Sequence, residues 1–184
     1  MIGAITAGLF GTGVAASTNS YESIATVTVG ASGTSTVSFT GIASTWKHLQ
    51  LRYLAVTPSG GNVLLQVGNG SPDTGSNYSR HQLYGDGSSA GSTATTSTTA
   101  MATGYLPGTS SYPGSGVVDL LDYANGNKYK TLRSLGGGDQ NGAGGYISLW
   151  SGVWMNTAAI TDIKITCAGT INQYSSFALY GIKG

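Results

Sequence analysis

Charge is scarce in this chain. Lys, Arg, Asp and Glu make up 8% of its 184 residues, against about 25% in an ordinary soluble domain. Charged residues and long aliphatic side chains form the exposed faces of helices, and Gly, Ser and Thr stand in their place here. A helical bundle is therefore excluded. Disorder is excluded too, because 40% of the residues are hydrophobic and 11 Tyr can fill a core. The length predicts a single folded domain.

Clustered positive charge, paired cysteines and long apolar runs are also missing. The net charge is +1 and the eight Lys and Arg are scattered, so we expect no nucleic-acid partner. Cys167 is the single cysteine; it has no disulfide partner and no zinc-site spacing, and we expect it to pack in a strand. No apolar run approaches the roughly 20 residues that cross a bilayer, so we expect no membrane association.

The N-terminal segment differs from the rest of the chain. Residues 1–16 read MIGAITAGLFGTGVAA, without charge, and the first lysine is Lys47, whereas a secretory signal begins with a basic segment. Glycine-rich termini become ordered only where something holds them. We expect residues 1–20 to form an extended arm whose large apolar side chains lie on a neighbouring chain; folding back over its own sandwich is the alternative. These side chains are Ile2, Ile5, Leu9 and Phe10.

From residue 21 onward, short alternating apolar runs are separated by Gly, Asn, Pro and Ser. The clearest strand covers residues 47–56, and the turn at 30–33 between runs 21–29 and 35–39 predicts a hairpin. The later half of the Ser/Thr run 92–99 is predicted to be an exposed strand. Further strands are predicted at 62–67, 78–84, 100–105, 116–123, 128–135, 146–154, 160–167 and 175–182. About ten strands without helical periodicity predict an all-β fold, an antiparallel jelly-roll β-sandwich over residues 21–184.

Residues for catalysis are few. His48 and His81 are expected to be hydrogen-bonded structural residues, and no G-x-S-x-G nucleophile motif is present. Asp119 and Asp122 are three residues apart in a predicted strand and so point to opposite faces, which disfavours a glycosidase pair. We predict no catalytic residue and no enzyme activity.

Ligand sites have little support as well. Asp73, Asp86 and Asp139 lie in loops that lack the calcium-loop motif, and we expect them to cap turns. The glycine-rich stretch 136–142 precedes no predicted helix, so it is not a phosphate loop. We expect no metal and no cofactor. Tyr146, Trp150 and Trp154 share one strand face, either as a platform that stacks on a glycan or, as we favour, as the core face of a central strand.

Several segments together resemble small virion proteins of tailed bacteriophages. They are YESIAT at 21–26, KHLQLR at 47–52, GSNYSRHQLYGDGSS at 75–89, LLDYANGNKYKTLRSLGG at 120–137, LWSGVWMNTAAITDIKIT at 149–166 and QYSSFALYGIKG at 173–184. The resemblance covers nearly everything from Tyr21 onward and leaves out the N-terminal arm. It implies a jelly-roll body that is a structural component of the virion, and it carries no catalytic residues.

Two roles are compatible with such a body. The first is a capsid cement or decoration protein on the outer capsid surface, a homotrimer that clamps neighbouring copies of the major capsid protein. The second is a tail-fibre or baseplate component that binds a host surface glycan. The small size favours the first, since a fibre usually needs a long shaft. In either case we expect the protein to be made in the host cytoplasm and to reside in the virion.

Overall fold

The computed structural model describes residues 20–109 and 111–184, and this part of the chain consists of twelve β-strands without a helix. The strands of its first half are β1 (Tyr21–Thr28), β2 (Thr34–Phe39), β3 (His48–Ala55), β4 (Gly61–Gly68), β5 (Tyr78–Gly85) and β6 (Ala90–Thr98). The second half contributes β7 (Met101–Leu106), β8 (Gly114–Leu121), β9 (Lys130–Asp139), β10 (Gly145–Trp154), β11 (Asp162–Ile171) and β12 (Ser176–Ile182).

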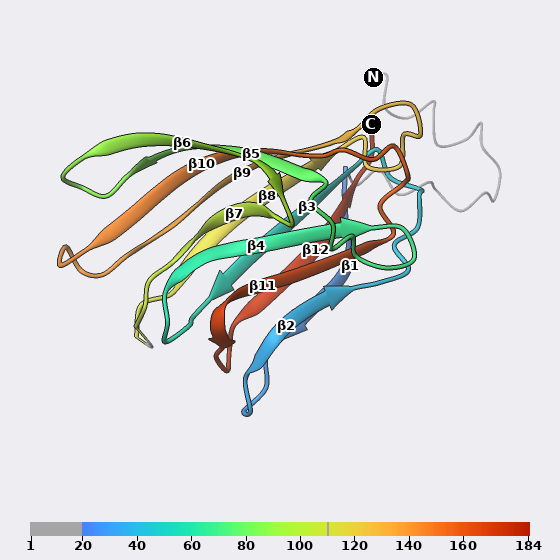
Figure 1. Cartoon of the computed structure of the whole chain (residues 1–184). Coiled ribbons are helices and arrows are strands. Elements are labelled where there is room, and N and C mark those ends of the chain that lie inside the picture. Colours follow the sequence, from blue (N-terminus) through green and yellow to red (C-terminus); the bar gives the residue numbers. More distant parts are fainter. Residues whose placement is uncertain (1–19, 110) are drawn as a thin grey trace, which may run out of the picture.

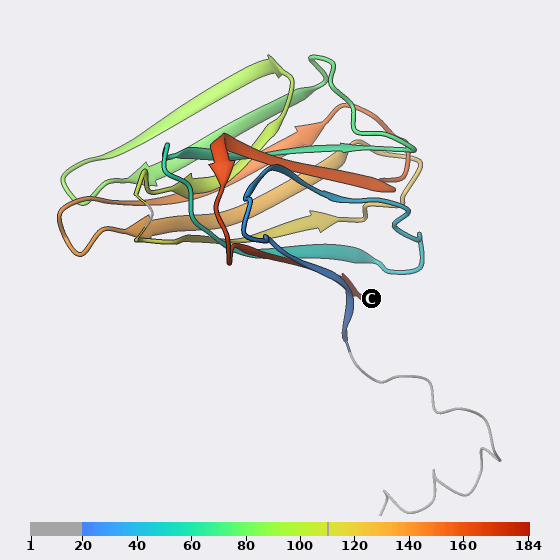
Figure 2. The ribbon, with the colours of Figure 1, turned by 90° about the horizontal axis from the view of Figure 1, so that it is seen from below.

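The strands form two antiparallel sheets that pack face to face as a β-sandwich (Figure 1). The larger sheet has eight strands in the order β1-β12-β3-β8-β9-β10-β5-β6, and the smaller sheet has four in the order β2-β11-β4-β7. The all-β antiparallel sandwich predicted from the alternating pattern is therefore confirmed. Figure 2 shows how the two sheets lie over one another, with the β5–β6 hairpin extending beyond the smaller sheet.

The core lies between the two sheets. In β3, the side chains expected on one face, Leu49, Leu51, Tyr53 and Ala55, are at most 4% exposed. Val63, Leu65 and Val67 of β4 meet them from the smaller sheet at 1% or less. Burial of alternate side chains follows from the pleat, which sends every second residue to the same face.

A buried lysine lies at the start of β9. Lys130 is 1% exposed, and its ammonium donates hydrogen bonds to the carbonyl oxygens of Asn125 (2.5 Å), Lys128 (2.9 Å) and Thr157 (2.8 Å). Loss of hydration on burial lowers the pKa of Lys130. The three carbonyls replace its water shell and tie the loop after β8 to the loop after β10.

The predicted hairpin of the two N-terminal runs is wrong. Both runs are strands and the turn between them forms, with the Gly33 N–H donating to the Gly30 carbonyl at 3.0 Å. However, β1 pairs with β12 in the larger sheet, whereas β2 pairs with β11 in the smaller one. The turn therefore connects the two sheets, and both strands pair with strands from the C-terminal end of the sequence.

The predicted exposed Ser/Thr strand is confirmed as β6, which lies at the edge of the larger sheet and is exposed along most of its length. Ser97 adopts a φ of +52°, and the pairing of β6 with β5 shifts register between Tyr78 and Arg80. Thr is a good strand former, which accounts for β-structure in a segment with no core residues.

Candidate functional site

The outer face of the larger sheet carries a band of apolar side chains. Val117 of β8 is directly opposite Leu135 of β9, Leu135 is opposite Leu149 of β10, and Leu149 is opposite Leu83 of β5. We call these four residues the apolar row. Their exposed fractions are 41%, 54%, 46% and 58% in that order. Because directly opposed side chains on one face are in contact distance, the row is a continuous apolar surface across four strands.

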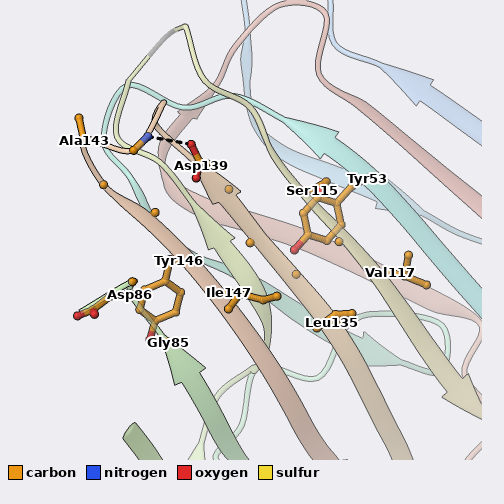
Figure 3. A pocket seen from close by; sticks show the side chains of 18 of the residues that line it. Tyr53, Gly85, Asp86, Ser115, Val117, Leu135, Asp139, Ala143, Tyr146 and Ile147 are labelled. Atoms are coloured by element: carbon orange, nitrogen blue, oxygen red, sulfur yellow. Dashed lines mark hydrogen bonds between the residues drawn. The ribbon is translucent and has the colours of Figure 1, made fainter. Parts of the chain in front are cut away.

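A hollow adjoins the apolar row on the side of the hairpin turns. The next set of opposed residues is Ser115, Gly137, Ile147 and Gly85, in which Ile147 alone has a large side chain. The hollow has a volume of about 1000 Å³, and Val117, Leu135 and Ile147 line it beside its glycines (Figure 3). A Cβ at Gly137 would lie 2.1 Å from the carbonyl oxygen of Tyr146, so glycine is required there and leaves the floor open.

Two hairpin turns form the rim of the hollow, and both lie at the same end of the molecule (Figures 1 and 3). In the β5–β6 turn, the Asp86 carboxylate accepts hydrogen bonds from the backbone N–H groups of Ser88 (2.9 Å) and Ser89 (2.7 Å). These bonds favour the charged form and lower the pKa of Asp86 to about 2. In the β9–β10 turn, Asp139 accepts one from the Gly142 N–H at 3.2 Å.

On its other side the apolar row is bordered by polar residues. The guanidinium of Arg133 lies 3.1 Å from the Asp119 carboxylate, which also accepts a hydrogen bond from the Gln50 amide at 2.8 Å. Ser151 and His81 continue this polar row across β10 and β5. The outer face of these four strands therefore changes, at steps of two residues, from polar side chains to the apolar row and then to the hollow.

A second charged group lies at the end of the sheet where β1 begins. Asp122 pairs with Lys47 at 2.7 Å and with Lys128, and its backbone N–H donates to His48 Nδ1 at 2.9 Å. The hydrogen bonds from Lys128 and Lys47 lower the pKa of Asp122 to about 2. Asp119 belongs to the polar row instead, so the structure does not bring the two carboxylates together.

The aromatic residues of β10 are divided between core and surface. Trp150 and Trp154 are 3% and 2% exposed; their indole N–H groups donate to Ser148 Oγ (3.0 Å) and to the Asp73 carboxylate (2.8 Å). Neither ring offers a face to solvent, and of the three predicted aromatics Tyr146 alone is partly exposed. Trp150 and Trp154 thus lie on the core face of the strand.

Tyr146 belongs instead to an aromatic cluster that the sequence did not suggest. Its ring centroid is 5.2 Å from that of Tyr84 and 4.8 Å from that of Tyr105, and its hydroxyl accepts a hydrogen bond from the Gln82 amide at 2.8 Å. Tyr105 and Tyr146 also line a smaller pocket of about 180 Å³. All three rings are partly exposed.

The other described residues that the sequence analysis singled out lie in strands and loops outside the hollow and the apolar row. Cys167 is a free, half-buried thiol in β11, and desolvation raises its pKa. Asp73 accepts bonds from the Gly75 N–H (2.8 Å) and the Asn77 amide (2.9 Å), so it caps its loop as expected, like Asp86 and Asp139. His81 is exposed on β5. In residues 20–109 and 111–184, no three His, Cys, Asp or Glu side chains are grouped so that they could hold a metal. Ile2, Ile5, Leu9 and Phe10 lie outside the described residues.

The sequence contained a signal for the apolar row, which is missed when each strand is read for one apolar face only. Strands with one solvated face alternate apolar and polar residues, but β8, β9 and β10 have apolar residues at positions of both parities, as in VVDLL and ISLW. The glycines at 136–138, which looked like a failed phosphate loop, form the floor of the hollow.

Comparisons of the chain with protein families, with curated proteins and with solved structures found no match. Among the described residues, no helix is long and apolar enough to cross a membrane. The assignment of a function therefore depends on the surface geometry and on the residues that form it.

Proposed function

We propose that this chain is a non-enzymatic structural protein of a bacteriophage virion, a capsid cement protein on the outer shell that joins neighbouring copies of the major capsid protein. The observation that carries the proposal is the apolar row beside the glycine-floored hollow. Contiguous apolar surface of this kind on a folded protein marks a contact surface, and the described residues leave it uncovered.

We propose further that the sandwich is a jelly roll. The strand orders β1-β12-β3-β8 and β2-β11-β4-β7 support this, because an eight-stranded jelly roll interleaves strands from the two ends of the chain in this way. The hairpins β5–β6 and β9–β10 are then additions to one sheet. They add the outer-face residues Leu83, Leu135, Ile147 and Leu149, so the additions supply most of the contact surface.

The mechanism of a cement protein is mechanical. Burial of apolar area contributes about 25 cal/mol per Å², so a modest patch gives a weak contact in a single copy. In a closed symmetric assembly the same contact is repeated, and each contact made raises the effective concentration for the next. A homotrimer that grips adjacent capsid subunits would then resist shell expansion through many weak contacts.

The deciding experiment is the copy number of this chain relative to the major capsid protein, measured by quantitative mass spectrometry of purified virions. A copy number comparable to that of the capsid protein is expected for a cement protein. A ratio of a few per hundred would reject a shell position and point to the tail.

A variant separates the contact surface from the fold. Leu135→Asp places a charge in the apolar row, and we expect it to abolish incorporation into particles, since burying an unpaired carboxylate is strongly unfavourable. Tyr174→Asp is the matched control, because Tyr174 is 78% exposed in the β11–β12 turn and belongs neither to the row nor to the lining of the hollow. Full incorporation of Leu135→Asp would show that the row makes no contact in the particle.

The second candidate function is a tail-fibre or baseplate component that binds a host glycan. The cluster of Tyr84, Tyr105 and Tyr146 favours it, because stacked, partly exposed aromatic rings with a neighbouring amide are suited to a sugar ring. Saturable binding of the wild-type protein to host surface polysaccharide, lost in Tyr105→Ala, would support this candidate. No binding would leave the cement function as the proposal.

A further inference from the structure

We propose that the hollow and the apolar row on the outer face of the larger sheet receive the N-terminal segment, residues 1–19, of a second copy of this chain. The proposal deepens the structural function above, on which it rests, by naming what covers the exposed apolar surface. Its test does not need the virion.

The chemistry of the segment matches the surface. Residues 1–19 contain no charged residue, and their large apolar side chains lie among Gly, Ala and Thr. The four residues of the apolar row and the glycines of the floor likewise carry no charge, and the charged residue that borders them is Arg52 of β3, directly opposite Val117. Ile or Phe side chains of such a segment can enter a hollow of about 1000 Å³ where glycines leave room.

The segment is long enough to leave its own body. At most about 3.3–3.6 Å per residue gives an extended reach of roughly 60 Å. The described chain begins at Ser20, whose carbonyl accepts a hydrogen bond from the Lys183 N–H at 3.1 Å, beside the C-terminal residue. This is the end of the sheet formed by His48 and Leu121, opposite to the end that carries the hollow.

The outer face disfavours docking of the segment on its own chain. To reach its own hollow, the segment would have to reverse direction and cross the polar row. An uncharged apolar segment over the Arg133–Asp119 pair would strip water from both groups without offering them a partner. A neighbouring copy is approached in the direction in which the chain already leaves β1.

The rim of the hollow disfavours the other self-association. If two copies met hollow to hollow around a two-fold axis parallel to the strands, the Asp86 and Asp139 carboxylates of both rims would be brought together. Asp86 stays charged well into the acid range, because its pKa is about 2. A segment without charge fills the hollow and creates no such repulsion.

The test is disulfide trapping in the full-length chain, with Cys167→Ser as background. Phe10→Cys and Leu135→Cys are placed in two differently tagged chains that are co-expressed and mildly oxidised. We expect a disulfide-linked species of twice the 18.6 kDa chain mass, with the Phe10–Leu135 link identified by mass spectrometry. Tyr174→Cys in place of Leu135→Cys is the control and should give at most a trace of linked species.

A second measurement does not depend on added thiols. Analytical ultracentrifugation should show the wild-type chain self-associating, and Phe10→Asp and Leu135→Asp should each raise the dissociation constant about tenfold or more. If Leu135→Asp fails to fold, Leu149→Ser on the neighbouring strand replaces it. Because the two single variants disrupt the same contact, the dissociation constant of the double variant should be close to that of either single variant.

Three outcomes would overturn the proposal: equal linking at the Tyr174→Cys control, no link at all, or dissociation constants unchanged by both aspartates. The failure of the virion function is a separate result. A low copy number in particles combined with Phe10–Leu135 linking would leave the docking intact and reject the cement role. A high copy number in particles without Phe10–Leu135 linking would support the cement role and reject the docking.

Discussion

The two faces of β8, β9 and β10 carry similar residues in opposite surroundings. On the inner face, Val118, Leu132 and Trp150 are at most 3% exposed. On the outer face, the row from Val117 to Leu149 is at least 41% exposed. Hydrophobicity therefore does not distinguish core from surface in these strands. What distinguishes them is that the described residues cover the inner face and leave the outer face exposed.

Because of this contrast, we expect the outer row to contribute less to the stability of the fold than the inner residues do. Inner residues hold the two sheets together, and the loss of any of them leaves a cavity. Under the proposed function, outer residues make their main contacts on association, so their removal should affect assembly far more than folding. The predictions that follow test this division, beginning with the largest expected change.

The inner face is tested most severely by Trp150→Ala. The indole is buried, donates to Ser148 and has the Arg80 guanidinium 5.7 Å from its ring centroid. We expect the free energy of unfolding to fall by about 4 kcal/mol, measured by urea denaturation. An unchanged melting temperature accompanied by lost sugar binding would instead identify Trp150 as a ligand contact.

The sharpest comparison uses one residue type in one strand. Leu132 of β9 is 0% exposed on the inner face, whereas Leu135 is 54% exposed on the outer face. Leu132→Ala should lower the free energy of unfolding by about 3 kcal/mol, and Leu135→Ala should change it by no more than about 0.5 kcal/mol. Both are measured at low protein concentration, where self-association does not contribute. Equal decreases in the free energy of unfolding would mean that Leu135 stabilises the fold as much as a core residue does.

The smallest expected effect is that of acid on the charged end of the sheet. The pKa of Asp122 is lowered from 3.8 to about 2 in the folded chain, so its stabilising effect is complete above pH 3.8 and is lost as the pH falls towards 2. Unfolding free energies measured between pH 5 and 2 should therefore decline less steeply in Asp122→Asn than in the wild type. Parallel curves would show that the pairs with Lys47 and Lys128 contribute nothing measurable, as is common for exposed ion pairs.

The sequence predicted what depends on local periodicity. The buried faces of β3 and β4 and the exposed strand β6 all follow from alternation and composition, which need no knowledge of partners. The pairing of β1 with β12 could not be read in this way, since it joins residues from the two ends of the chain.

Apolar residues of both parities in β8 and β10 were a signal for the apolar row, but its arrangement across the sheet could not be read from the sequence for the same reason. It depends on a register that places Leu83 beside Leu149 and Leu149 beside Leu135 across the larger sheet. Each of these leucines looks like an ordinary strand residue in its own segment. The aromatic cluster was missed likewise, since Tyr84, Tyr105 and Tyr146 come from three separate strands.

The irregular edge at β6 bears on the shape of any assembly. An edge strand with free backbone groups invites the next molecule to extend the sheet, and repeated extension yields fibres. The positive φ of Ser97 and the shifted register beside it interrupt the straight ladder that such growth would need. This edge of the sheet is therefore poorly suited to continued growth by strand addition, which disfavours open-ended stacking of copies.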